Sequence, residues 1–162
     1  MDREQILKYQ IGPNLSGVGN LSKIFAIQTF ANHEFEVTPE QFSVFSVLVK
    51  QDGLYQRQLS IPTLKDRHNI SRIISILESK GYVTKTIDTT TRKVFKISIT
   101  EEGKKVYEKI LPEILRIWIE TVEGIPTEEL DIFYDVLIFF LFHYDANIII
   151  QALFLSIFEM ME

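Results

Sequence analysis

Side chains able to contact DNA bases and phosphates recur along the segment 65–81, KDRHNISRIISILESKG. Arginine, asparagine, histidine and serine together offer the donors and acceptors that read base edges in a major groove. The candidates are Arg67, His68, Asn69, Ser71, Arg72 and Ser75. Apolar residues fall between them at helical spacing, as one stripe of Ile70, Ile73, Ile74 and Leu77. The pattern predicts a helix with one buried face and one polar face almost free of acid, which suits DNA.

Both ends of this helix are indicated by the sequence. Asp66 is a good N-cap residue, and Gly81 is a good residue just beyond the C-terminus. An ordinary amphipathic surface helix would show the same boundaries and the same stripe. The neighbouring segments must therefore decide between the two interpretations.

Two alternating segments follow the helix. Residues 82–87 and 94–99 are rich in β-branched and aromatic side chains, as strands are. The polar loop between them, residues 88–93, ends in Arg92 and Lys93. A hairpin directly after a helix-turn-helix forms a winged helix, whose basic loop contacts phosphates or a minor groove. A solvated hairpin is the alternative for this segment alone.

Helices are predicted before the segment 65–81 as well. A short helix over residues 1–12 should end at Gly12-Pro13, and a second should run to about His33. The run from Thr38 to Gln41 is a strong helix start, and that helix should end at Gly53. A short helix at about 55–60, ended near Pro62, completes the helix-turn-helix.

The C-terminal part is apolar and helical. Thr100 can cap a helix that Pro112 should kink, and Gly124 and Pro126 separate it from a last segment starting at Thr127. This last segment carries a near-heptad apolar pattern, and Asp145-Ala146-Asn147 leaves open whether it is one helix or two. So much apolar helix outside the basic module predicts a homodimer.

Charge is distributed unevenly over the 162 residues. The net charge is −5, yet residues 41–100 hold ten basic and four acidic residues, a net +6, which leaves −11 for the rest. One basic module in an acidic chain is typical of a segment that meets phosphate. Cysteine is absent, which excludes disulfides and thiolate zinc sites. With no signal peptide expected at the N-terminus, we expect a cytoplasmic protein.

Nothing in the sequence points to catalysis or to a cofactor. The histidines, His33, His68 and His143, have no metal-ligand spacing, and the serines lie outside any nucleophile motif. We therefore expect no enzyme activity, no cofactor and no metal. The last segment, from residue 127 on, lacks lysine and arginine, which disfavours a peripheral membrane role.

Four motifs resemble the MarR family of bacterial transcriptional regulators. They are Val37-Thr38-Pro39-Glu40-Gln41-Phe42, Lys65-Asp66-Arg67 with Ile70-Ser71-Arg72, Leu77-Glu78-Ser79-Lys80-Gly81-Tyr82-Val83, and Ile99-Thr100-Glu101-Glu102-Gly103. The resemblance implies dimerisation helices at residues 1–36 and 101–162 around a winged helix-turn-helix at 37–100. It also implies a small-molecule effector, of a kind and at a site that remain unknown. The family's wing carries an Asp-Arg pair, and here Thr91 precedes Arg92.

The predicted fold class is mainly α with a small β-hairpin (α+β), a winged helix flanked by terminal dimerisation helices. The predicted function is a homodimeric, sequence-specific DNA-binding regulator, a ligand-responsive repressor on a pseudo-palindromic operator. The alternative is a winged-helix module that docks proteins through its apolar C-terminal helices. Salt dependence of binding to random duplex separates the two, because only the DNA binder loses affinity steeply with salt.

Overall fold

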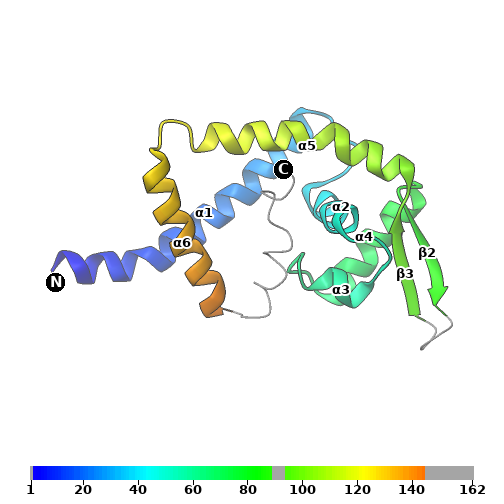
Figure 1. Cartoon of the computed structure of the whole chain (residues 1–162), viewed down its shortest axis with the longest axis horizontal. Helices are drawn as coiled ribbons and strands as arrows, with labels where there is room; N and C mark the ends of the chain where they lie inside the picture. Colours follow the sequence, from blue (N-terminus) through cyan, green and yellow to red (C-terminus); the bar gives the residue numbers. More distant parts are fainter. Residues whose placement is uncertain (1, 89–93, 145–162) are drawn as a thin grey trace. The chain divides into compact units, whose positions relative to one another are not determined.

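The computed structural model describes residues 2–88 and 94–144 of the protein (Figure 1). The chain divides into two compact units, of which the first ends at Pro39 and the second begins at Glu40. Among the described residues, helices dominate and a small antiparallel sheet accompanies them, so the predicted fold class is confirmed. The elements are α1 (Arg3–Asn32), α2 (Pro39–Lys50), β1 (Leu54–Tyr55), α3 (Gln56–Ser60), α4 (Arg67–Ser79), β2 (Val83–Asp88), β3 (Val94–Ile99), α5 (Glu101–Thr121) and α6 (Thr127–Tyr144).

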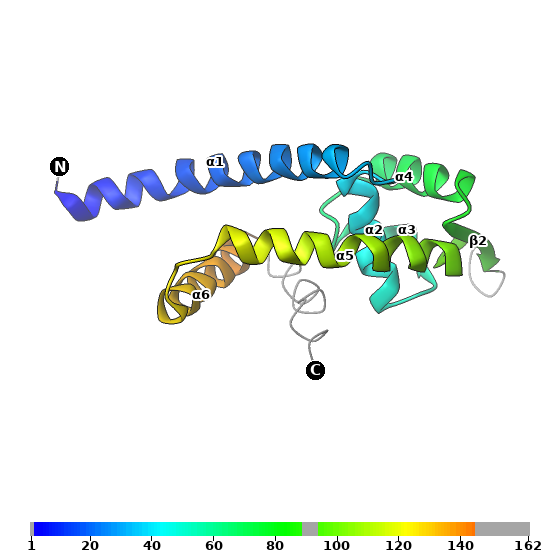
Figure 2. The same ribbon diagram turned by 90° about the horizontal axis from the view of Figure 1, so that it is seen from above.

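The first unit contains the single long helix α1, drawn without a break in Figure 2. Asp2 caps it, because its carboxylate accepts from the Gln5 backbone N–H at 2.8 Å and the Gln5 side chain accepts in return. The predicted break at Gly12-Pro13 is wrong, since Pro13 lies inside the helix. Gly12 has no Cβ to meet the proline ring, so the usual clash before a proline is relieved and one missing N–H is tolerated.

The second unit contains the helix-turn-helix and a three-stranded sheet of order β1-β3-β2. β2 and β3 form the predicted hairpin, antiparallel in register from Val83 opposite Ile99 to Asp88 opposite Val94. The two-residue strand β1 was not predicted. It pairs with the other edge of β3, where Leu54 lies opposite Ile97. The sheet is thereby tied to α3, which starts directly after β1.

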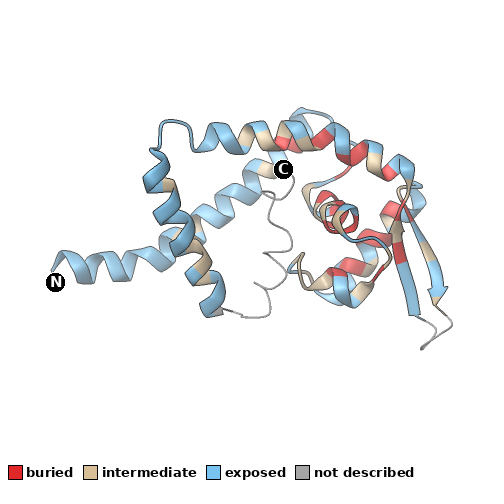
Figure 3. Ribbon diagram, in the orientation of Figure 1, coloured by how far each residue is buried: buried red, intermediate tan, exposed pale blue. Residues whose placement is uncertain are grey.

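Buried side chains concentrate in the winged-helix part of this unit, as the red segments in Figure 3 show. The predicted stripe of α4 is confirmed, since its four apolar side chains are at most 1% exposed. They belong to a core whose fully buried members are Phe45, Leu48, Leu59, Ile70, Ile73, Ile74, Leu77, Ile97, Ile110, Val44 and Val83. Burying each such side chain stabilises the fold by about 1.5–3 kcal/mol, so this core fixes the orientation of α4.

Both ends of α4 have the predicted caps. The Asp66 carboxylate accepts from the Asn69 backbone N–H at 2.9 Å, and this hydrogen bond holds the pKa of Asp66 below its ordinary value of 3.8. At the other end, Gly81 adopts a left-handed φ of +76°. The Tyr82 N–H then donates to the Leu77 carbonyl at 2.9 Å, which closes the helix in a Schellman motif.

α5 starts where the sequence predicted. Thr100 Oγ1 accepts from the Gly103 N–H at 3.1 Å and donates to the Gly81 carbonyl at 2.8 Å. The first turn of α5 therefore rests on the chain that leaves α4. Pro112 lies inside α5, and α6 begins at Thr127, as expected. The region around Asp145, where the sequence left one helix or two open, lies outside the described residues.

Gly103 allows this close approach, and we expect Gly103→Ala to destabilise the protein. A Cβ at this position would lie 2.3 Å from the Tyr82 carbonyl oxygen and 2.9 Å from Ile99 Cγ1. Because the nearest atom belongs to backbone, the expected loss in the free energy of unfolding is about 3 kcal/mol. Urea unfolding measures it. Glu108→Ala, at an exposed position of the same helix, is the control and should change this value by less than about 0.5 kcal/mol. Equal effects would contradict the close contact.

The lowered pKa of Asp66 predicts a pH-dependent contribution to stability. A depressed carboxyl pKa stabilises the folded state above the ordinary value of 3.8, and this contribution disappears as pH falls through the folded-state pKa. Asp66→Asn keeps a capping oxygen but removes the charge. We therefore expect the loss of stability caused by Asp66→Asn to be larger at pH 7 than at pH 3, in urea unfolding. Asp66→Ala removes the acceptor and should destabilise at both pH values. A pH-independent effect of Asp66→Asn would contradict the assignment.

Candidate nucleic-acid interface

The six residues predicted to face DNA all lie on α4, on the side away from its buried stripe. Ser71 is half-buried and the other five are exposed. They are Arg67, His68, Asn69, Ser71, Arg72 and Ser75. The structure therefore brings the predicted side chains together on one helix face, with donors and acceptors directed outward from the core.

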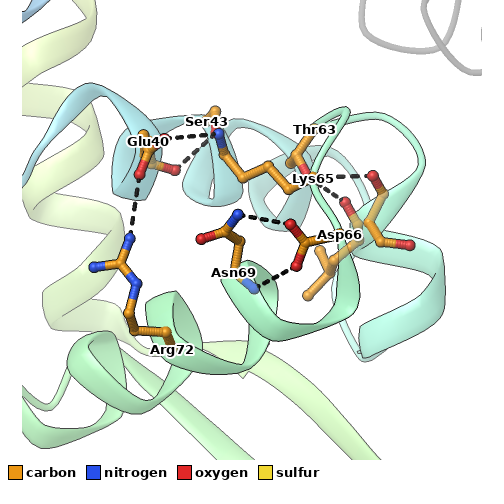
Figure 4. Close-up of polar contacts among 9 residues, drawn as sticks. Glu40, Ser43, Thr63, Lys65, Asp66, Asn69 and Arg72 are labelled. Atoms are coloured by element: carbon orange, nitrogen blue, oxygen red, sulfur yellow. Dashed lines mark hydrogen bonds and ion pairs between the residues drawn. The ribbon is translucent and has the colours of Figure 1, made fainter.

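Two of these side chains are already oriented by hydrogen bonds within the chain. Asn69 Nδ2 donates to Asp66 Oδ2 at 2.8 Å, so the capping residue also fixes the Asn69 amide (Figure 4). Ser75 Oγ donates to the Ser71 carbonyl at 2.9 Å. Asn69 keeps its carbonyl oxygen and its second N–H for a ligand, and the Ser75 hydroxyl can accept but not donate.

A second acidic residue, besides Asp66, lies close to the polar face of α4. Glu40, in the first turn of α2, accepts from Lys65 Nζ at 3.4 Å through Oε1 and from Arg72 Nη2 at 3.5 Å through Oε2 (Figure 4). The sequence pattern did not predict this contact. Glu40 is separated from its partners by 25 and 32 residues, and no local pattern reveals such a pair.

A groove of about 650 Å³ lies between α3, the start of α4 and the hairpin. Its lining combines cationic and apolar side chains, which are Tyr55, Gln56, Arg57, Ser60, Arg67, Lys85, Val94 and Phe95. Lys85 is also ion-paired with Glu78 at 2.5 Å. Arg57 and Lys85 were not among the predicted contact residues. Cations beside apolar side chains can receive a sugar-phosphate backbone, so both residues extend the candidate interface beyond α4.

The predicted wing residues Arg92 and Lys93 lie outside the described residues. The structure describes the base of the hairpin, where the half-buried carboxylate of Asp88 joins the strands. Tyr55 Oη donates to Asp88 Oδ2 at 2.5 Å, and Lys96 Nζ lies 3.9 Å from the same oxygen. Lys96 Nζ also lies 5.8 Å from the centre of the Tyr55 ring. These contacts tie β1 to both strands of the hairpin.

The described part of the chain was also expected to hold no metal site and no membrane-spanning helix. Residues 2–88 and 94–144 contain no group of three or more histidine and acidic side chains arranged to hold a metal ion. Within the same ranges, no helix combines the length and the apolar content that crossing a bilayer requires. Two histidines make local contacts: Nδ1 of His33, which follows α1, lies 3.0 Å from the Thr29 carbonyl, and His143 on α6 stacks on Phe139.

No family model matches the chain. An uncharacterized HTH-type transcriptional regulator of Bacillus cereus is 30% identical over 95 residues, which are 59% of this chain. The match spans 63% of that relative, less than two thirds of its length.

Solved structures of similar fold cover more of the chain. A MarR family transcriptional regulator from Rhodococcus sp. RHA1 is 25% identical with a TM-score of 0.70, over 81% of this chain and 91% of that one. CouR from Rhodococcus jostii RHA1, solved bound to p-coumaroyl-CoA, is 25% identical with a TM-score of 0.67, over 78% and 88%. With its capped α4 and its hairpin, the chain is thus similar in fold to a MarR family transcriptional regulator and similar in sequence to HTH-type transcriptional regulators.

Proposed function

We propose that the protein is a homodimeric, sequence-specific DNA-binding regulator that acts in the bacterial cytoplasm as a ligand-responsive repressor. The observation that carries the proposal is the outward face of α4, where arginine, histidine, asparagine and serine stand opposite a fully buried stripe. Residues 37–100 form the DNA-binding part, and residues 1–36 and 101–162 form the dimerisation helices. Two copies of α4 enter successive major grooves of a pseudo-palindrome, about one helical turn apart.

In this proposal, different residues contact the bases and the sugar-phosphate backbone of the DNA. Arg67, His68, Asn69, Ser71, Arg72 and Ser75 reach base edges, since they share the exposed face of α4. Arg92 and Lys93 on the wing contact phosphates or a minor groove, and Arg57 and Lys85 in the groove contact the backbone. The net charge of +6 over residues 41–100 supplies the attraction to DNA that does not depend on sequence.

Exposed apolar side chains on the terminal helices support a homodimer. On α1 they are Ile6, Leu7, Tyr9, Ile11, Val18, Leu21, Ile24, Phe25 and Ile27, and on α6 they are Ile132, Phe133, Tyr134, Val136, Phe139, Leu141 and Phe142. Monomeric proteins rarely expose apolar surface in such continuous runs, because burying it against a partner is favourable. A second copy of the same chain, related by two-fold symmetry, is the simplest partner that covers both helices.

A small-molecule effector is supported by similarity alone. CouR, a relative by structure, was solved with p-coumaroyl-CoA, and that ligand is a fact about CouR. For this protein we propose an effector that changes the spacing of the two α4 helices. Such a ligand acts only as far as it binds one spacing more tightly than the other.

We expect Arg72→Ala to weaken binding to an operator selected from a pool of random duplexes. Loss of a base contact should cost about 1–3 kcal/mol and relax the base preference at one position of each half-site. Fluorescence anisotropy with the selected duplex and its single-base variants measures both effects. Lys105→Ala on α5 removes the same charge at an exposed position and should change neither. An unchanged affinity in Arg72→Ala would contradict the groove assignment. Absence of DNA binding at any salt concentration would instead favour the protein-docking alternative.

We expect the protein to sediment with twice the chain mass of 18.9 kDa and Phe139→Glu to shift it toward the monomer. Phe139 is 67% exposed on α6, and a carboxylate there would have to be desolvated in a dimer contact. Sedimentation equilibrium measures the mass. Ile87→Glu changes an apolar residue of similar exposure, 59%, on the hairpin and should leave the mass unchanged. A monomeric wild-type protein at micromolar concentration would rule out the proposed dimer.

A further inference from the structure

Glu40 places a negative charge on a surface that otherwise suits DNA. Its side chain is 54% exposed, and its two carboxylate oxygens contact two different cations, Lys65 and Arg72. Figure 4 shows Glu40 reaching from α2 toward α4, with Arg72 extending to meet it. A carboxylate at this position repels phosphate, so attraction to the DNA backbone cannot be its contribution.

The two cations differ in how firmly the fold holds them. The Lys65 side chain is 17% exposed, and its backbone is fixed because the Lys65 N–H donates to the Ser60 carbonyl at 3.1 Å in the turn between α3 and α4. The Arg72 side chain is 60% exposed on the open face of α4. Glu40 therefore links a well-anchored lysine to an exposed arginine. Loss of the Glu40 contact would change the orientation of the arginine side chain more than that of the lysine.

One contact to Glu40 is enough to direct the Arg72 guanidinium. The group is planar with five N–H donors, so an Nη2 hydrogen bond to Glu40 sets the direction of the donors that remain. Those donors can still meet guanine O6 and N7 in the major groove. In the absence of Glu40, the same long side chain could turn toward the nearest phosphate, as arginine readily does.

The energies involved permit an exchange between partners. Exposed ion pairs typically contribute ~0–1 kcal/mol, so DNA can displace Glu40 from either cation at small cost. On arbitrary DNA, however, a cation that turns toward a phosphate gives up its contact with Glu40, and the carboxylate then faces the DNA without that partner. We propose that Glu40 is a specificity-determining residue of the interface, which restrains Lys65 and Arg72 from phosphate and positions Arg72 for base readout.

This inference rests on the proposed DNA binding and is tested with the full-length protein. Affinities of wild type and Glu40→Gln are measured by anisotropy for the selected operator and for a scrambled duplex of equal length, at several salt concentrations. Glutamine keeps the size of the side chain and removes its charge. We expect Glu40→Gln to bind the scrambled duplex about 3–10-fold more tightly, and the operator-to-scrambled affinity ratio to fall. The salt slope on scrambled DNA should steepen by up to about 0.9 for each cation released.

Two controls separate this role from a general change in charge or stability. Glu102→Gln on α5 removes the same charge from an ion pair with Lys105 and should leave the affinity ratio unchanged. In a background of Lys65→Ala and Arg72→Ala, Glu40→Gln should no longer lower the ratio, because Glu40 acts through those two residues. Circular dichroism confirms that each variant is folded.

The outcomes are distinct. An unchanged ratio in Glu40→Gln, or an equal change on both duplexes, overturns the inference while leaving DNA binding intact. A ratio that still falls in the double-alanine background also overturns it, since Glu40 would then act on DNA directly. Failure of the wild-type protein to bind either duplex defeats the proposed function itself.

Discussion

Burial of one apolar stripe on α4 decides which side chains this protein presents to its surroundings. Four side chains of the stripe are at most 1% exposed, and at about 1.5–3 kcal/mol each their burial outweighs any single polar contact on the opposite face. A rotation of α4 about its axis would lose that burial, so the polar face cannot turn inward. The caps at Asp66 and Gly81 fix where the helix starts and ends. The rotation of α4 about its axis is therefore set by apolar burial, and its two ends are set by the caps.

Carboxylates tune the polar face that this burial exposes. Asp66 fixes the Asn69 amide, and Glu40 contacts the Arg72 guanidinium. Both contacts lie in solvent, where ion pairs and hydrogen bonds are weak enough to be exchanged for contacts to the DNA that we propose as ligand. Weak contacts of this kind would suit a protein that recognises DNA sequence. They reduce the number of side-chain conformers before binding, and the donors can still exchange their intramolecular partners for base edges that offer a better geometry.

Features of the fold could be predicted from the sequence where the residues that determine them are neighbours along the chain. The ends of α4 were predictable because Asp66 and Gly81 act on neighbouring residues, and the hairpin was predictable from alternation within each strand. The strand β1 was missed because two residues carry no periodicity, and only pairing with β3 makes Leu54 part of a sheet. The pairing of Glu40 with Arg72 was not predicted for the same reason, since the two residues are 32 positions apart and meet only in the folded chain. The predicted helix break at Gly12-Pro13 was wrong because a proline disfavours helix mainly through the Cβ of the residue before it, and Gly12 has no Cβ.

Burial differs between the winged helix and α6, and this difference bears on the proposed dimer. The winged helix has a core of its own, whereas α6, in the same unit, exposes Phe133, Phe139 and Phe142. Covering such a face by a second copy would stabilise α6 by mass action and make its folding depend on protein concentration. In such a dimer, the distance between two copies of α4 would be set by the helices that pair the two chains. A change in the packing of those helices could therefore alter operator affinity without altering any residue that touches a base, because the two faces of a dimer must fit one duplex at the same time.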